Sequence, residues 1–149
     1  MPPLFTIGYE RASAAEVIAA LNAAGVELLV DVRAVAASRR AGFSKSVLRA
    51  SLEEAGVAYL HLRDLGTPKA GRDAARAGRC EEMREIFADW LNEPAAVTAF
   101  EQLAEEAGRR RTCLLCFEAD PACCHRQVVA ERLTTRTPRP VNHLAAARL

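Results

Sequence analysis

Lysine, aromatic residues and net charge are all scarce in this chain of 149 residues. Lysine occurs only at Lys45 and Lys69, so arginine supplies nearly all of the positive charge, and aromatic residues make up 5% of the chain. Lysine and arginine together number 20 against 19 acidic residues, which gives a net formal charge of +1. This balance disfavours a protein that coats nucleic acid or lies on a membrane surface, so we expect any basic character to be local.

Long hydrophobic runs and an export signal are also missing. No apolar run approaches the roughly 20 residues that a bilayer span requires, and residues 1–8 lack a basic region followed by a long apolar one. We therefore expect a cytoplasmic protein with no membrane partner. Hydrophobic residues make up 50% of the chain, enough for one core, and no repeat or boundary divides it. The sequence thus predicts a single α/β domain over residues 1–149.

The cysteines are few and unevenly placed. The chain holds five of them, Cys80, Cys113, Cys116, Cys123 and Cys124. An odd number in a chain without an export signal argues against a disulfide framework, so we expect reduced thiols and assign Cys80 no role. Glycine-rich dinucleotide-binding motifs and phosphate-binding loops are absent as well, and the sequence predicts no cofactor.

What the sequence does contain is an alternation of apolar runs and amphipathic stretches. Apolar runs predict strands over residues 4–8, 26–32, 57–62, 112–117 and 140–144. Helical spacing of apolar residues predicts helices over residues 13–25, 44–56, 83–91, 94–108 and 124–134. Residues 65–78 hold three glycines and one proline and are expected to form a long loop or short helical turns. Strands separated by helices predict a three-layer α/β/α domain with a mainly parallel sheet of about five strands.

Ionisable side chains follow the predicted strands, where ligands of parallel α/β sheets bind. The strand-end groups are Tyr9, Asp31, Arg33, His61, Cys116 and Glu118, and a short loop after the last of them leads to Cys124, His125 and Arg126. Strand ends are also polar simply because the core stops there. Asp31, for example, can pair with Arg33 with no ligand involved. The group of residues is therefore a stronger signal than any one member.

The segment from Arg33 to Arg49 is basic without compensation. It carries Arg33, Arg39, Arg40, Lys45 and Arg49 and no acidic residue. Five positive charges attract an anion, and arginine offers two parallel hydrogen bonds to phosphate or carboxylate. The alternative is a solvated basic loop that contacts acidic residues elsewhere.

The second signal is the segment from Cys116 to Arg126. A helix that begins near residue 122 or 123 would turn its free N–H groups toward the sheet edge, where they lower the pKa of a thiol. The segment can be an anion cradle, a nucleophilic thiol or a metal site. Cys113 and Cys116 are three apart on a strand and should point to opposite faces, which makes Cys113 a core residue. A metal set of Cys116, Cys123, Cys124 and His125 remains possible, but adjacent cysteines chelate one ion awkwardly, and no metal site is assigned.

Several motifs together resemble one known family. They are TIGYE at 6–10, LVDVR at 29–33, SR at 38–39 with FSK at 43–45, YLHL at 59–62 with LGTP at 65–68, LCFE at 115–118 and CHR at 124–126. In this order they resemble the family catalogued as domain of unknown function 488, over nearly the whole chain. The resemblance implies a compact α/β domain of bacterial or archaeal cytoplasm and supplies no activity.

Three functions fit these residues. The first is an enzyme that acts on a phosphorylated or other anionic substrate, such as a nucleotide or nucleic acid, in a basic cleft. Its predicted catalytic residues are Cys116, Cys124, His125 and Asp31, and its predicted substrate-binding residues are Arg33, Arg39, Lys45, His61, Glu118, Arg126 and Tyr9. A cysteine would attack, and an imidazole would transfer protons. The second is a nucleotide- or nucleic-acid-binding module without chemistry, and the third is a thiol redox or metal-binding protein. The sequence does not indicate an oligomeric state.

Overall fold

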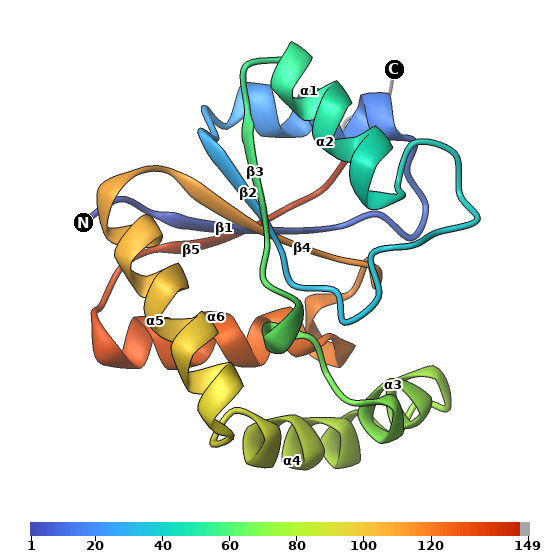
Figure 1. The fold of residues 1–149 in the computed structure, drawn as a ribbon, viewed down its shortest axis with the longest axis vertical. Helices are drawn as coiled ribbons and strands as arrows, with labels where there is room; N and C mark the ends of the chain where they lie inside the picture. The colour runs from blue at the N-terminus through green and yellow to red at the C-terminus, as the bar shows by residue number, and fades with distance from the viewer. Residues whose placement is uncertain (147–149) are drawn as a thin grey trace.

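A parallel sheet forms the centre of the molecule (Figure 1). The computed structural model describes residues 1–146. Within them the sheet has five strands in the order β3-β2-β4-β1-β5, every neighbouring pair parallel. The strands are β1 (Leu4–Gly8), β2 (Leu28–Asp31), β3 (Ala58–His61), β4 (Thr112–Cys116) and β5 (Val141–Leu144). The predicted three-layer α/β/α fold is confirmed.

The strand register brings three strand ends together. Gly8 of β1 lies opposite Cys116 of β4, and Asp31 of β2 lies opposite Leu115 of β4. Because β4 lies between β1 and β2, the segments that follow these three strands leave the sheet side by side. This edge is where the sequence places its ionisable groups.

Two helices cover one face of the sheet, α1 (Ala14–Ala23) and α2 (Lys45–Glu54) (Figure 1). The predicted capping box of α1 is present, because Ser13 accepts from the Glu16 N–H and Glu16 accepts from the Ser13 N–H. Such a box satisfies two helix N–H groups that otherwise lack a partner. The buried stripe of these helices comprises Val17, Leu21, Leu48 and Leu52.

The other face is covered by α5 (Pro94–Arg109) and α6 (His125–Arg136), and α4 (Cys80–Trp90) packs against α6 (Figure 1). Their buried residues form a separate cluster that includes Met83, Phe87, Leu103, Val129 and Leu133. The α6 helix begins at His125, close to the predicted start at residue 124. It does not begin at residue 122 or 123, because Pro121–Cys123 forms a short 3₁₀ turn, η2, and Cys124 is the N-cap. No helix of residues 1–146 has both the length and the apolar character that a membrane span needs.

The segment expected to form a long loop or short helical turns holds a short turn and a regular helix. A 3₁₀ turn, η1 (Arg63–Leu65), is followed by α3 (Lys69–Arg76), which packs on α4. The glycine that suggested a loop has a packing role: a Cβ added at Gly71 would meet Thr67 Oγ1 at 2.1 Å. Pro68 directly precedes the first turn, where its missing N–H is harmless. Glycine and proline here mark close packing and a helix start.

Candidate functional site

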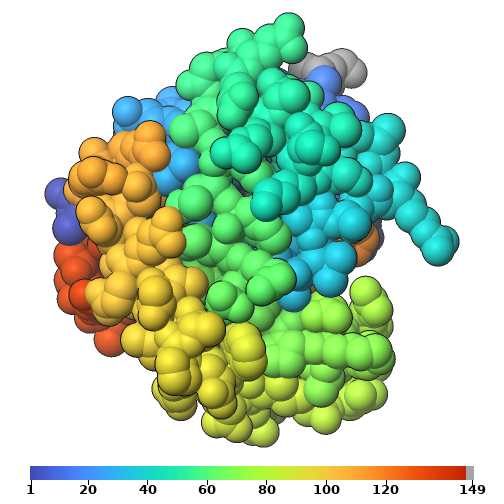
Figure 2. All heavy atoms as spheres, viewed as in Figure 1, coloured from blue at the N-terminus to red at the C-terminus, as the bar shows by residue number. Residues whose placement is uncertain are grey.

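A pocket of about 800 Å³ opens at the carboxyl ends of β1, β2 and β4. Residues of the 33–37 segment line one side and α3 lines another. In Figure 2 the cyan loop and the light green α3 border an indentation at the right-hand edge of the molecule. The predicted site residues on its wall are Tyr9, Arg33, Cys116, Glu118 and His125. The predicted residues Asp31, Arg39, Lys45, His61, Cys124 and Arg126 are not on that wall.

Asp31 and Arg33 form a buried ion pair. Asp31 is fully buried and Arg33 is 5% exposed, and Arg33 Nη2 lies 2.7 Å from Asp31 Oδ2. Arg33 also donates its backbone N–H and its Nε–H to Asp31 Oδ1, and Tyr59 donates its hydroxyl to Oδ2 at 2.6 Å. Each carboxylate oxygen therefore accepts two hydrogen bonds, which is the condition under which a buried charge is tolerated.

The same arginine reaches the next element as well. Its Nη1 donates to the Tyr9 hydroxyl at 3.1 Å and to the Phe43 carbonyl at 2.7 Å. Burial lowers the pKa of Arg33, but the hydrogen bond and charge of Asp31 outweigh burial and raise it above its usual value. Burial, followed by the hydrogen bond to Asp31, raises the pKa of Tyr59 far above its usual value. Arg33 is thus held mainly by protein groups, with one edge at the pocket.

His61 is turned toward the backbone. Its Nε2 lies 2.8 Å from the Arg33 carbonyl, so this nitrogen donates. Arg40 binds backbone too, with bonds to the carbonyls of Tyr9, Glu10 and Ala12 that fasten the basic loop to the turn after β1. Arg39 and Lys45 are exposed. The basic stretch therefore divides into a residue that fixes the loop and residues that face solvent.

A second buried cluster joins two thiols, an imidazole and a carboxyl group. Cys116 Sγ lies 3.4 Å from His125 Nδ1 and 3.5 Å from Glu118 Oε2. Cys124, the N-cap of α6, is 1% exposed. One donor atom from each of Cys116, Cys124 and His125 lies within 4.8 Å of the other two. These residues come from the end of β4 and the start of α6, as the sequence suggested.

The orientation of His125 is fixed by a backbone contact. Its Nε2 lies 2.7 Å from the Val32 carbonyl, which can only accept, so the Nε2–H donates. The ring edge also packs on Phe87, with centroids 5.2 Å apart. Nδ1 therefore faces the thiols, where it can accept or donate a proton.

Burial and mutual contact separate the pKa values of this cluster. Burial raises the pKa of Cys116, and the neighbouring Cys124 raises it further. Burial acts the same way on Cys124, but hydrogen bonds from Cys116 and His125 outweigh it, so the pKa of Cys124 falls well below its usual value. Burial lowers the pKa of His125, yet the hydrogen bond to Cys124 reverses the effect and the net change is upward. The pKa of Glu118 is raised by burial and by the charge of Cys124. The pKa of Cys124 is thus shifted toward the thiolate form and the pKa of His125 toward the protonated form.

Arg126 lies behind this cluster, not in the pocket. It is 1% exposed and donates to the carbonyls of Glu118 and Ala119. Its Nε has no hydrogen-bond partner, and within residues 1–146 no carboxylate oxygen lies within ion-pair distance of its side chain. Its charge lowers the pKa of Cys124. Arg126 thus holds the loop after β4 in place and favours the thiolate.

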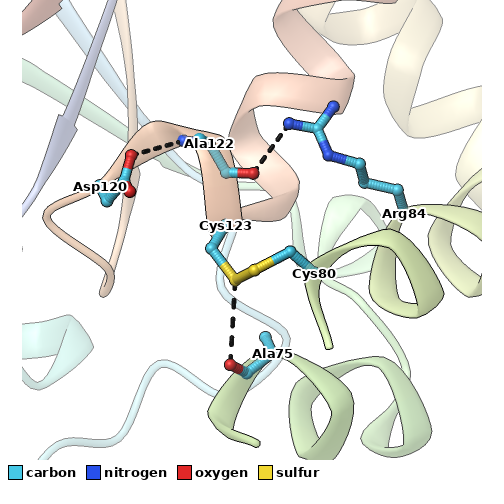
Figure 3. The surroundings of a disulfide bond; sticks show 6 residues. All are labelled: Ala75, Cys80, Arg84, Asp120, Ala122 and Cys123. Atoms are coloured by element: carbon cyan, nitrogen blue, oxygen red, sulfur yellow. Dashed lines mark hydrogen bonds between the residues drawn. A yellow bond between two sulfur atoms is a disulfide. The ribbon is translucent and has the colours of Figure 1, made fainter. Parts of the chain in front are cut away.

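The expectation of reduced thiols is wrong for two cysteines. Cys80 and Cys123 form a disulfide that joins the start of α4 to the η2 turn (Figure 3). Figure 3 also shows Arg84 donating to the Ala122 carbonyl at 2.8 Å, a second tie between the same segments. Cys80, to which the sequence assigned no role, therefore fastens the α3–α4 pair to the loop that carries the thiol cluster. The bridge also removes Cys123 from any metal set.

The wall formed by α3 is the part that sequence reasoning missed. Lys69, Arg72 and Arg76 line the pocket, with one acidic residue, Asp73, among them. Their spacing of three and four residues places them on one side of a helix. That signal was available, but it carries meaning only once residues 69–76 are taken as helical. Phe117, a second aromatic residue of the pocket beside Tyr9, is 40% exposed and was also missed.

Comparison with known proteins identifies a family for this chain. The sequence model of the family described as domain of unknown function DUF488 matches residues 13–133. No curated protein and no solved structure matches the chain.

Proposed function

The chain belongs to the DUF488 family, whose name assigns no activity, and from the pocket we propose that it is an enzyme acting on a phosphate-bearing substrate, a nucleotide or nucleic acid. The observation that carries this proposal is that one wall of the pocket is cationic and another carries a thiol and an imidazole. Lys69, Arg72 and Arg76 lie on one wall, and the thiol of Cys116 with the imidazole of His125 lies on another.

The cations of α3 are suited to bind an anion because most of their hydrogen-bonding groups are not used in contacts within the protein. Lys69 and Arg76 have side chains that are 80% and 75% exposed, and the ion pairs that they form within residues 1–146 are with the exposed Asp73. Arg72 uses one guanidinium nitrogen, Nη1, to donate a hydrogen bond to the Thr67 carbonyl. Three cations and one acidic residue leave this wall positive, and arginine binds phosphate with two parallel hydrogen bonds.

Two further carboxylates of the pocket, those of Glu10 and Asp120, belong to segments other than α3 and have backbone partners. Glu10 accepts from the Ala119 N–H at 3.0 Å, and Asp120 accepts from the Ala122 N–H at 2.9 Å. Both belong to the side of the pocket formed by the loop after β4 and the turn after β1. The charge of the pocket is therefore divided, with the positive part on α3, and a bound phosphate is expected there.

Apolar surface at the same pocket supports a nucleotide rather than a bare phosphate. Phe117 is 40% exposed and Val35 is 57% exposed, and both line the pocket. Exposed aromatic rings beside cations bind nucleic-acid bases by stacking. A base on Phe117 and a phosphate on α3 would bring the intervening bonds close to Cys116 and His125.

A pair of probes tests this proposal. The thymidine dinucleotide with a 5′-phosphate and the same dinucleotide without it are titrated calorimetrically, and products are sought by mass spectrometry. We expect the 5′-phosphate to strengthen binding about tenfold, a gain of roughly 1.4 kcal/mol. The double variant Lys69→Ala/Arg76→Ala should abolish most of that gain. The matched control, Arg109→Ala/Arg136→Ala, removes the same charge from exposed positions of α5 and α6 and should bind like the wild type.

Two results would overturn the proposal. Equal affinity for both probes, or equal losses in both double variants, would mean that the pocket does not recognise phosphate. Phosphate-dependent binding without any product, across nucleotides and single strands, would replace the enzyme with a binding module.

A further inference from the structure

We propose that Cys116, Cys124 and His125 form a zinc site whose fourth ligand position faces the pocket. This inference goes beyond the proposed function and rests on the geometry of the cluster alone. It holds whether or not the pocket binds an anion.

The spacing of the donor atoms fits a tetrahedral metal. With Zn–S bonds of about 2.3 Å and Zn–N bonds of about 2.0 Å, a sulfur and a nitrogen ligand lie roughly 3.5 Å apart. Cys116 Sγ and His125 Nδ1 are separated by 3.4 Å. Cys124 supplies the third donor, since one donor atom from each residue lies within 4.8 Å of the others. The proposed ion would lie among these three donor atoms.

The histidine is oriented as metal ligands are. A ligating histidine commonly donates its other ring N–H to a carbonyl, which fixes the ring and the free nitrogen. His125 does so through Nε2 to the Val32 carbonyl at 2.7 Å, leaving Nδ1 toward the thiols. The packing of the ring on Phe87 restrains it further. The site therefore has a rigid nitrogen ligand before any metal arrives.

The ligand set selects zinc and leaves a position open. Two thiolates and one imidazole form a soft, compact set that suits Zn²⁺ better than Mg²⁺ or Ca²⁺. Cys116 and His125 reach the pocket wall while Cys124 does not, so the open side of the ion would face the pocket. A water or a phosphate oxygen could take that position, and three protein ligands with one exchangeable ligand are typical of catalytic zinc.

The disulfide makes the ligand set definite. Cys123 is bonded to Cys80 and cannot bind the ion, and Cys113 is fully buried on the opposite face of β4 among a different cluster of core residues. Within residues 1–146, two of the three free thiols belong to the site. Thiol counting can therefore separate ligands from the bystander.

The test uses Co²⁺ and Zn²⁺ alone, added to the purified metal-free protein with its disulfide intact. We expect one Co²⁺ per chain, with the near-ultraviolet absorption of cobalt–thiolate bonds, and displacement of Co²⁺ by one Zn²⁺. Zinc should protect two of the three free thiols from alkylation. Cys116→Ser and Cys124→Ser should each weaken zinc binding more than about 100-fold, above the range for residues that only support a ligand. Cys113→Ala is the matched control and should still bind one ion.

A wild-type measurement keeps the test independent of variant folding. X-ray absorption of the zinc-loaded protein should show two sulfur and two nitrogen or oxygen neighbours. An all-nitrogen/oxygen shell, no Co²⁺ uptake, or equal loss in Cys113→Ala would overturn the site. Because the dinucleotide titration uses a different probe, failure of zinc binding and failure of anion binding are distinguishable.

Discussion

Two buried polar clusters lie at the ends of neighbouring strands and differ in how completely their side chains satisfy one another. At the end of β2, both oxygens of Asp31 accept two hydrogen bonds each, from Arg33 and Tyr59. The cluster at the end of β4 contains two thiols and a carboxyl group, which can be anionic, and one imidazole. Its residues are Cys116, Cys124, Glu118 and His125. The first cluster is closed in the sense that its charges satisfy one another, although Arg33 has one edge at the pocket. The second cluster is open, because Cys116 and His125 reach the same pocket without a full set of protein partners.

The difference separates a structural role from a functional one. A charge pair whose hydrogen bonds are all made within the protein has little capacity left for a ligand, and its removal exposes a buried charge. A cluster of thiols, a carboxyl group and an imidazole with shifted pKa values keeps groups that can bind or react, and such clusters are enriched at functional sites. Proximity at one sheet edge therefore does not give two clusters the same role.

The largest expected effect comes from breaking the closed cluster. Asp31→Ala leaves Arg33 as an uncompensated buried cation, and we expect the free energy of unfolding to fall by about 3–5 kcal/mol. Urea denaturation followed by circular dichroism measures this. The control is Glu53→Ala, which removes the exposed pair with Arg49 and should change stability by less than about 1 kcal/mol. Similar losses in both variants would show that the Asp31 network is not structural.

A smaller effect is expected from the disulfide that fastens one wall of the pocket. Cys80 and Cys123 are 43 residues apart, and a bridge across such a loop is worth about 2–4 kcal/mol, chiefly by restricting the unfolded chain. The double variant Cys80→Ala/Cys123→Ala should lose that amount in urea denaturation.

Reductant provides the internal control for this prediction. It should lower the stability of the wild type toward that of the double variant and leave the double variant unchanged. A wild type that is insensitive to reductant under unfolding conditions would contradict a disulfide at these positions.

The sheet was predictable because its signals are local. Five apolar runs predicted the five strands, and the Ser13–Glu16 capping box predicted the start of α1. Alternation along β4 correctly placed Cys113 and Cys116 on opposite faces, since each belongs to a different core cluster. Successive side chains of a strand point to opposite faces because of the backbone geometry, so the spacing of two residues on a strand predicts their faces.

The site was less predictable because its contacts are not local. Cys80 and Cys123 pair only because α4 packs beside the η2 turn, which no spacing in the sequence shows. Beyond a strand end the alternation stops, so the sequence could not tell that Arg126 turns into the core while Cys116 reaches the pocket. Gly71 suggested a loop because glycine density does not distinguish flexibility from close packing.

The smallest expected effect is the change in the free energy of unfolding when a residue of the open cluster at the end of β4 is replaced. Cys116→Ala removes one sulfur atom. His125 keeps its hydrogen bond to the Val32 carbonyl, and Glu118, which loses the bond from Cys116, is only half-buried and remains within reach of solvent. We expect the free energy of unfolding of the metal-free protein to change by less than about 1 kcal/mol in urea denaturation. Cys113→Ala, on the same strand and fully buried, should cost at least as much because it leaves a cavity in the core. If instead Cys116→Ala destabilised the protein as strongly as Asp31→Ala, both clusters would be structural, and the distinction between a closed pair and an open site would fail.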